Sequence, residues 1–168
     1  MPHSITAWMH KDNVASWTWP GYEGKPANVD VYSEAEEVEL LLNGTSLGRK
    51  PAGEKHGFMA TYEMTYEPGE LLAVSYCNGE ETGRDVLYTA GEKVQMQVDC
   101  EGEVLKADGA DLAFLTVKLT DDKGIDNLFA QKEITVTVEG AGTLQGFGNA
   151  DPRAIGSYDD TTWKTFVG

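Results

Sequence analysis

Apolar and polar residues alternate along most of the chain with a period of two. The alternating segments are residues 27–32, 38–42, 58–66, 71–77 and 84–89, followed by 94–99, 112–120 and 134–138. This period is typical of β-strands that bury one face. No segment of about 11 residues repeats apolar side chains at i, i+3, i+4 and i+7, the spacing of an amphipathic helix. We therefore predict that the protein is all-β.

The segment from Val38 to Lys50 predicts a β-hairpin closed by Asn43-Gly44. Asn and Gly both tolerate the positive φ of a two-residue type I′ loop, whose twist matches that of the flanking strands. A loop at these residues sets three cross-strand pairs, Leu42 with Thr45, Leu40 with Leu47 and Val38 with Arg49. The pairing predicts one buried face made of Val38, Leu40, Leu42 and Leu47.

Turn residues divide the pattern into two parts. Residues 4–19 predict a loose first strand and an entry loop, so the first part has about seven strands. The alternation restarts after Ala90-Gly91-Glu92. We predict two domains, residues 1–91 and residues 92–168, joined by a very short linker. Short strands separated by turns are typical of immunoglobulin-like β-sandwiches of about 100 residues, so we expect two of them in tandem.

The charge of the chain excludes some partners. Lys and Arg number 13 against 28 Asp and Glu, which gives a formal net charge of −15. Nucleic acid or an anionic membrane would meet a repulsive field, so we expect neither as a partner. No run approaches the ~18 apolar residues of a spanning helix, and the first residues lack the basic and apolar regions of a signal peptide. Any targeting segment is expected elsewhere, and the compartment stays open.

Cysteine and histidine residues do not predict a cross-link or a metal site. Cys77 and Cys100 fall in different predicted domains, so we expect two free thiols, which are typical of a reducing compartment. The histidines His3, His10 and His56 are not spaced with either cysteine as metal ligands are. We predict no metal and no cofactor.

Several motifs that resemble binding sites are better explained by turns. No helix pattern follows the glycines at residues 140–142 or 146–148, as a phosphate-binding loop requires. The oxygen-bearing residues Asp121, Asp122, Asp126 and Asn127 do not match a calcium-binding loop and predict a plain turn. Asn43-Gly44-Thr45 is a glycosylation sequon, which the hairpin turn explains. The 28 acidic residues make chance carboxylate pairs inevitable, so none is singled out as a glycosidase pair.

Trp17, Trp19 and Tyr22 are the candidate contacts for a carbohydrate. An aromatic ring can stack on the apolar face of a sugar while polar groups around it bond the hydroxyls. Trp17 and Trp19 are two residues apart, so on a strand both would point to one face. Packing in the core or between domains is the favoured interpretation, and contact with a sugar is the alternative.

Two sets of motifs resemble modules of bacterial glycoside hydrolase family 2 enzymes. Residues 16–25, 29–33, 38–40 and 47–50 are similar to the β-sandwich module that follows the catalytic barrel in that family. Residues 107–114, 138–142 and 146–152 are similar to the next module. Together the two resemblances cover nearly the whole chain from about residue 16.

The resemblance implies a parent enzyme of the β-galactosidase or β-glucuronidase class. Its upstream barrel would supply the acid/base Glu and the nucleophile Glu, and no catalytic residue is carried over onto this chain. In the family the second module continues past a motif like Phe166-Val167-Gly168 into a further apolar strand, whereas this sequence ends there. We therefore expect a piece of a longer polypeptide, whose second sandwich lacks its last strand and exposes an edge open to self-association.

The sequence thus predicts a non-catalytic accessory region that packs on the catalytic barrel of its parent chain and shapes the surroundings of the substrate. One alternative is a carbohydrate-binding module in which Trp17, Trp19 or Tyr22 stacks on an oligosaccharide or polysaccharide. The other is a structural or adhesin-type domain of a surface protein. The two halves do not repeat each other detectably, which counts against a simple array.

Overall fold

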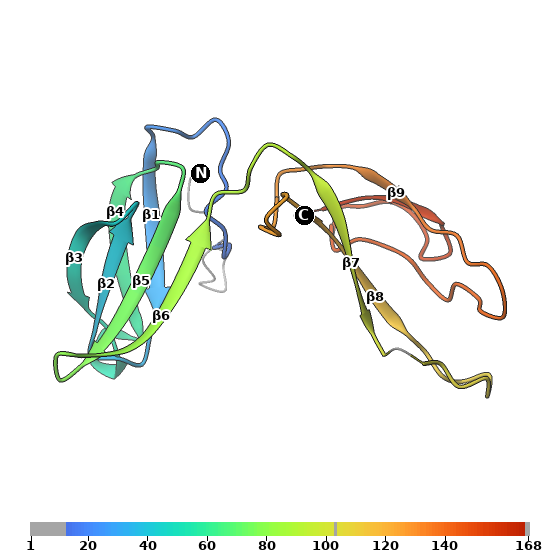
Figure 1. Cartoon of the computed structure of the whole chain (residues 1–168), viewed down its shortest axis with the longest axis horizontal. Coiled ribbons are helices and arrows are strands. Elements are labelled where there is room, and N and C mark those ends of the chain that lie inside the picture. Colours follow the sequence, from blue (N-terminus) through green and yellow to red (C-terminus); the bar gives the residue numbers. More distant parts are fainter. Residues whose placement is uncertain (1–12, 103, 167–168) are drawn as a thin grey trace. The chain divides into compact units, whose positions relative to one another are not determined.

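The chain consists of two compact all-β units. A computed structural model describes residues 13–102 and 104–166, and the chain divides between Thr89 and Ala90. Ten β-strands and one three-residue 3₁₀ helix, η1 (Glu54–His56), are the regular elements of the described residues (Figure 1). The prediction of an all-β protein is confirmed. No helix of these residues is long and apolar enough to cross a membrane.

The first unit contains two antiparallel sheets. Its strands are β1 (Pro26–Tyr32), β2 (Glu37–Leu42), β3 (Thr45–Pro51), β4 (Met59–Thr65), β5 (Glu70–Cys77) and β6 (Glu80–Tyr88). One sheet has four strands in the order β3-β2-β5-β6, and the other pairs β1 with β4. Residues 13–19 of the predicted first strand are not in a strand, and residues 4–12 lie outside the described residues.

The core of the first unit lies between its two sheets. The four-stranded sheet contributes Val38, Leu40, Leu42 and Leu71, and β4 contributes Ala60 and Tyr62. Trp17 and Tyr66 close the cluster, with their ring centroids 4.9 Å apart in an edge-to-face contact. Because both sheets bury one face against the other, this unit is a β-sandwich. Its assignment to the immunoglobulin type remains a prediction.

The hairpin of β2 and β3 begins as predicted and then changes register. Asn43 and Gly44 have φ values of 50° and 79°, and Leu42 is opposite Thr45, so the predicted loop and first pair are confirmed. Beyond them the prediction is wrong, because Leu47 and Gly48 together oppose Leu40, and Val38 pairs with Lys50 rather than Arg49. Gly48 has a φ of 93°, the left-handed conformation that lets a glycine insert one extra residue as a bulge.

The bulge also corrects the predicted buried face. Val38, Leu40 and Leu42 are buried, but Leu47 is 38% exposed. Tyr62 of β4 reaches across the core, and its hydroxyl donates to the carbonyls of Val38 at 2.6 Å and Gly48 at 3.3 Å. The carbonyl of the bulge residue is therefore satisfied from inside the sandwich.

The second unit has two antiparallel pairs. β7 (Gln95–Glu101) pairs with β8 (Phe114–Thr120), as the alternation predicts, and β9 (Glu133–Thr135) pairs with β10 (Thr162–Lys164). β9 is shorter than the predicted strand at 134–138, and the sequence pattern did not predict β10. One face of the β7–β8 pair carries Met96, Val98 and Leu115, which are 59%, 46% and 63% exposed. Leu119 is the one buried apolar residue in the described part of this unit.

Candidate functional site

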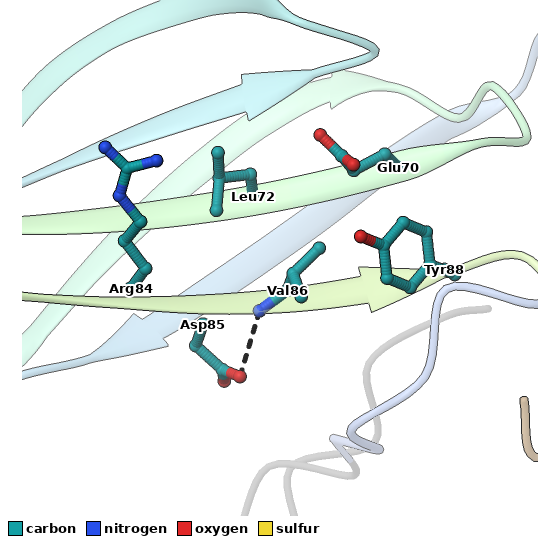
Figure 2. Close-up of a pocket in the computed structure, with 6 residues that line it drawn as sticks. All are labelled: Glu70, Leu72, Arg84, Asp85, Val86 and Tyr88. Carbon is teal, nitrogen blue, oxygen red and sulfur yellow. Dashed lines mark hydrogen bonds between the residues drawn. The ribbon is translucent and has the colours of Figure 1, made fainter.

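The outer face of the four-stranded sheet carries a groove that we call the outer groove. It is lined by Glu70, Leu72, Arg84, Asp85, Val86 and Tyr88, and its volume is about 300 Å³. Leu72 is opposite Val86 and Glu70 is opposite Tyr88 in the β5–β6 pair, so cross-strand neighbours form the floor. Figure 2 shows these side chains on the two adjacent strands, with the Tyr88 ring at one end and Arg84 at the other.

The polar side chains of the outer groove are held by hydrogen bonds. A hydrogen bond to the carboxylate of Glu70, together with its negative charge, raises the pKa of Tyr88. Arg84 donates to both oxygens of Glu81, at 2.5 and 2.8 Å, and this bond lowers the pKa of Glu81. Asp85 accepts a hydrogen bond from the backbone N–H of Val86 at 3.0 Å. The polar rim is therefore fixed before any ligand arrives.

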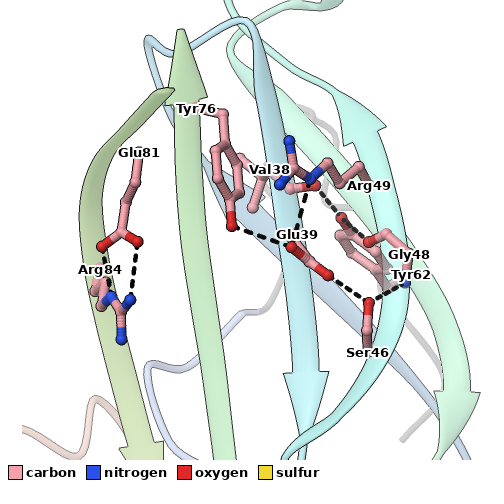
Figure 3. A network of polar contacts seen from close by, with 9 residues as sticks. All are labelled: Val38, Glu39, Ser46, Gly48, Arg49, Tyr62, Tyr76, Glu81 and Arg84. Atoms are coloured by element: carbon pink, nitrogen blue, oxygen red, sulfur yellow. Dashed lines mark hydrogen bonds and ion pairs between the residues drawn. The ribbon is translucent and has the colours of Figure 1, made fainter. Parts of the chain in front are cut away.

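A network centred on Glu39 covers the same face beside the groove (Figure 3). The Glu39 carboxylate accepts hydrogen bonds from the hydroxyls of Ser46 at 2.6 Å and Tyr76 at 3.1 Å, and from Nε of Arg49 at 3.4 Å. The Arg49 guanidinium lies 3.5 Å from the centroid of the Tyr76 ring. Val74 of β5 is opposite Glu39 and is therefore next to this network. It is buried but does not belong to the core cluster. The network therefore seals the outer face over β2 and β5.

The carboxyl groups of the described residues have the electrostatics of structural anions. Hydrogen bonds from Ser46 and then Tyr76 lower the pKa of Glu39, and backbone N–H groups lower those of Asp108, Asp121 and Asp151. The hydrogen bonds from Arg84 lower the pKa of Glu81 in the same way. A glycosidase general acid requires a pKa raised toward neutrality. These carboxylates are thus suited to accept hydrogen bonds and not to donate protons.

The three aromatic residues that the sequence nominated lie at one end of the first sandwich. Trp17 is 4% exposed, and its indole N–H donates to the carbonyl of Glu67 at 3.0 Å. Trp19 and Tyr22 are half-buried and pack against the core cluster. Lys25 places its Nζ 4.5 Å from the centroid of the Tyr22 ring. Only Trp19 and Tyr22 therefore offer part of a ring to a ligand.

Asp121 closes the turn after β8. It is 2% exposed and accepts backbone hydrogen bonds from Gly91 at 2.7 Å, Lys123 at 2.8 Å and Ile125 at 2.9 Å. One carboxylate oxygen is thus used inside the turn, by Lys123 and Ile125, and the other accepts from Gly91, which agrees with the interpretation of this segment as a plain turn. Over residues 13–102 and 104–166, no cluster of three or more His, Cys, Asp or Glu side chains is arranged to hold a metal ion.

The remaining nominated residues form no site together. Cys77 is partly buried in the first unit, Cys100 is exposed in the second, and neither forms a disulfide. His56 ends η1, and His3 and His10 lie outside the described residues. In the glycine segment at 146–148, the N–H of Phe147 donates to the carbonyl of Tyr158 at 2.8 Å, so this segment pairs with another loop.

The sequence pattern did not single out Tyr88, Arg84 or Tyr76. Their positions follow from the second Asn-Gly turn, Asn78-Gly79, whose φ values of 53° and 81° match the first. A register shift between Ser75 and Tyr76 moves the pairs beyond it by one residue. The turn predicts that β5 and β6 form a hairpin, which is confirmed, but it does not predict which side chains meet in the groove.

Two family models match consecutive parts of the chain. Residues 24–83 match a domain of unknown function, DUF4982, and residues 96–168 match glycoside hydrolase family 2 C-terminal domain 5. A β-galactosidase from Bacteroides ovatus is 32% identical over 158 residues, which cover 90% of this chain and 18% of the relative.

Solved structures agree with the family matches. A glycosyl hydrolase family 2 member from Bacteroides cellulosilyticus is 40% identical with a TM-score of 0.88, and the match covers 92% of this chain and 20% of that one. A β-glycosidase from Bacteroides vulgatus is 28% identical with a TM-score of 0.81, over 92% of this chain and 20% of that one. The chain therefore spans about a fifth of the length of these relatives.

Proposed function

Because the chain belongs to the C-terminal region of glycoside hydrolase family 2, we propose that it is a non-catalytic accessory part of a larger enzyme of the β-galactosidase class. One observation supports this proposal. Nearly the whole chain aligns with these relatives, yet the alignment covers only about a fifth of their length. In this proposal the chain packs on a catalytic barrel located elsewhere in the parent polypeptide and shapes the surroundings of the substrate.

The electrostatics of the chain support a non-catalytic role. Retaining and inverting glycosidases both need one carboxyl group with a raised pKa and a second one a few ångströms away. Here five carboxyl groups, those of Glu39, Glu81, Asp108, Asp121 and Asp151, have a lowered pKa, and Glu39 and Asp121 use their oxygens in hydrogen bonds within the chain. Carboxylates that are held in this way are suited to a structural role and not to proton transfer.

The test is hydrolysis by the purified chain. We expect no turnover of p-nitrophenyl β-galactoside or p-nitrophenyl β-glucuronide above a mock purification from the same host. A longer polypeptide that also carries the barrel should hydrolyse one of them under the same conditions. Turnover that co-purifies with the chain and exceeds the mock preparation would overturn the proposal.

A carbohydrate-binding role for the aromatic end of the first unit is a second candidate, supported by the half-buried rings of Trp19 and Tyr22. Burial of Trp17 argues against that residue as a stacking ring. Trp19→Ala should then weaken retention of the chain in affinity electrophoresis on a galactan gel. Unchanged retention would remove this candidate. Family membership disfavours the adhesin-type alternative.

Self-association of the second unit is a further proposal. It is supported by the exposed apolar residues Met96, Val98 and Leu115 on one face of the β7–β8 pair. Sedimentation velocity at increasing protein concentration should then show a growing dimer fraction. A single monomeric species at about 100 µM would contradict it, since weak interfaces associate in this range.

A further inference from the structure

We propose that the outer groove is a binding subsite for a neutral hexopyranose ring of an oligosaccharide, with the ring of Tyr88 as the stacking platform. Neither the accessory role nor the aromatic end of the first unit assigns a function to this groove. The proposal is argued from the side chains of β5 and β6 alone.

The floor of the groove has the apolar character that a sugar ring requires. Tyr88 is 43% exposed and Val86 is 37% exposed, and Leu72 lies beside them on β5. In Figure 2 the Tyr88 ring is drawn nearly face-on beside Val86 and Glu70, and Leu72 lies beyond them toward Arg84. The C–H face of a pyranose can pack on such a surface, as apolar groups do on aromatic rings.

The rim of the groove supplies hydrogen-bonding groups for the hydroxyls at the edge of a sugar. Glu70 presents acceptors and Arg84 presents a planar set of donors, whereas the Asp85 side chain points to the other side of β6 (Figure 2). Glu70 is bonded to Tyr88, and Arg84 is held by Glu81 through two hydrogen bonds. Side chains already fixed in this way lose little conformational freedom on binding.

The charge of the groove selects a neutral ligand. The Glu70 carboxylate lines it with one guanidinium, that of Arg84, which is itself paired with Glu81. The formal net charge of −15 adds a repulsive field for anions. A uronic acid or a sulfated sugar would bring a further negative charge to a face that already carries Glu70 and Glu81. A neutral hexose fits this chemistry better than a glucuronate.

The size and support of the groove suit a small saccharide. Its volume of about 300 Å³ is at the lower end of ligand pockets in general. All six lining residues lie on β5 and β6, and a site on strands is more rigid than a site on loops. We expect one ring to bind tightly enough to be measured, with the neighbouring rings of the oligosaccharide in solvent.

The test is a titration of the isotope-labelled chain with β-1,4-galactotriose, followed by amide chemical shifts. A small polar ligand with one stacking partner should bind with a Kd of about 1 mM or weaker. The shifts should be confined to β5 and β6. Glucuronic acid at the same concentration should produce no shifts, because of the acidic rim.

Substitutions of Tyr88 and of a control tyrosine distinguish the loss of ring stacking on the sugar from a general loss of the fold. Tyr88→Ala should weaken binding by about tenfold because the platform is removed, whereas Tyr88→Phe keeps the ring and should bind within about threefold of the wild type. Tyr32→Ala is the matched control, an exposed tyrosine on β1 of the same unit, and should leave binding unchanged. The amide spectrum of each variant shows whether the fold is kept.

Three results would overturn the proposal. They are the absence of shifts with galactotriose, equal binding by a folded Tyr88→Ala variant, and loss of binding in Trp19→Ala instead of Tyr88→Ala. Hydrolysis of a chromogenic galactoside by the chain would overturn the accessory function and leave the groove untouched. The two proposals can therefore fail separately.

Discussion

The two units of the chain share one sequence pattern but differ in what they bury. In the first unit, the inward residues of β2, such as Val38 and Leu40, are 1% exposed against the opposite sheet. In the second, Met96 and Leu115 occupy equivalent alternating positions on β7 and β8 and are 59% and 63% exposed. Alternation therefore predicts which face of a strand is apolar, but burial needs a second layer, which no period in the sequence specifies.

The difference in burial implies different sources of stability. Burying an aliphatic side chain contributes about 1.5–3 kcal/mol, so the first unit can draw on its own core. The described part of the second unit relies more on turns and hydrogen bonds, such as those of Asp121. The following substitutions test this contrast, from the largest expected effect to the smallest.

Leu40→Ala should produce the largest loss, about 2–5 kcal/mol of unfolding free energy, because it leaves a cavity in the core of the first unit. Urea denaturation followed by tryptophan fluorescence measures it. Leu47→Ala on the facing strand is the matched control. Leu47 is 38% exposed, so its loss should stay below about 1 kcal/mol. Equal losses at the two positions would contradict the register that the bulge creates.

Tyr66→Phe should destabilise the first unit by about 0.5–1.5 kcal/mol, because two hydrogen bonds to the backbone are lost while the Thr89 hydroxyl still donates to the Trp17 carbonyl at 2.7 Å. The Tyr66 hydroxyl donates to the carbonyl of Trp17 at 3.2 Å and accepts from the N–H of Trp19 at 3.1 Å. Tyr32→Phe removes the hydroxyl of a tyrosine that is 63% exposed and should have almost no effect. If thermal unfolding gives the same midpoint for both variants, the Tyr66 hydroxyl does not anchor the aromatic end.

Asp121→Asn should destabilise the second unit in a pH-dependent way, by less than Leu40→Ala destabilises the first. The N–H groups of Gly91 and then Ile125 hold the pKa of Asp121 below its ordinary value of 3.8. A lowered folded-state pKa stabilises the fold above the unfolded pKa of about 4, and this stabilisation is lost as the pH falls through the folded value.

Amide-resolved melting between about pH 2 and pH 7 measures the effect of Asp121. The wild-type second unit should lose stability below about pH 4, and Asp121→Asn should already lack this contribution at neutral pH. Asp126→Asn is the control, since that carboxylate is exposed beside Lys118 at 3.9 Å. An identical acid response in wild type and Asp121→Asn would show that the turn does not depend on the carboxylate.

Leu115→Ser should have the smallest effect on stability, within about 0.5 kcal/mol, because the side chain is already 63% exposed. It should reduce the binding of a hydrophobic dye such as ANS, because one apolar group leaves the exposed face. Val74→Ser, at a buried position of the first unit, should instead lower the unfolding midpoint. A large loss from Leu115→Ser would show that something covers β8 in solution.

The sequence predicted the strands well where one face is apolar, and the Asn-Gly turns set the first cross-strand pairs. It could not predict the register beyond the bulges. At Gly48 the extra residue depends on a glycine with positive φ and on the Tyr62 hydroxyl that reaches the bulge carbonyl. These contacts link residues of different sheets, so no local period contains them.

The candidate site was less predictable than the fold. Aromatic content pointed to Trp17, which is buried, whereas Tyr88 lines the outer groove in a strand whose outward residues are mixed in polarity. The groove exists because β5 and β6 bring Glu70 opposite Tyr88 and Leu72 opposite Val86. A second bulge, between Ser75 and Tyr76, shifts this pairing by one residue. A register counted from the Asn78-Gly79 turn without the bulge would therefore have paired different residues.

The side chain of Asn43 has a consequence for the chemical ageing of the protein. Asn-Gly sequences deamidate when the glycine nitrogen attacks the side-chain carbonyl carbon and closes a succinimide ring. The amide of Asn43 donates to the carbonyl of Pro68 at 3.1 Å and accepts from the N–H of Glu70 at 2.9 Å, and both bonds oppose the required rotation. We expect peptide mapping of aged protein to show slower deamidation at Asn43 than at Asn78, so that two turns of one geometry have different chemical lifetimes.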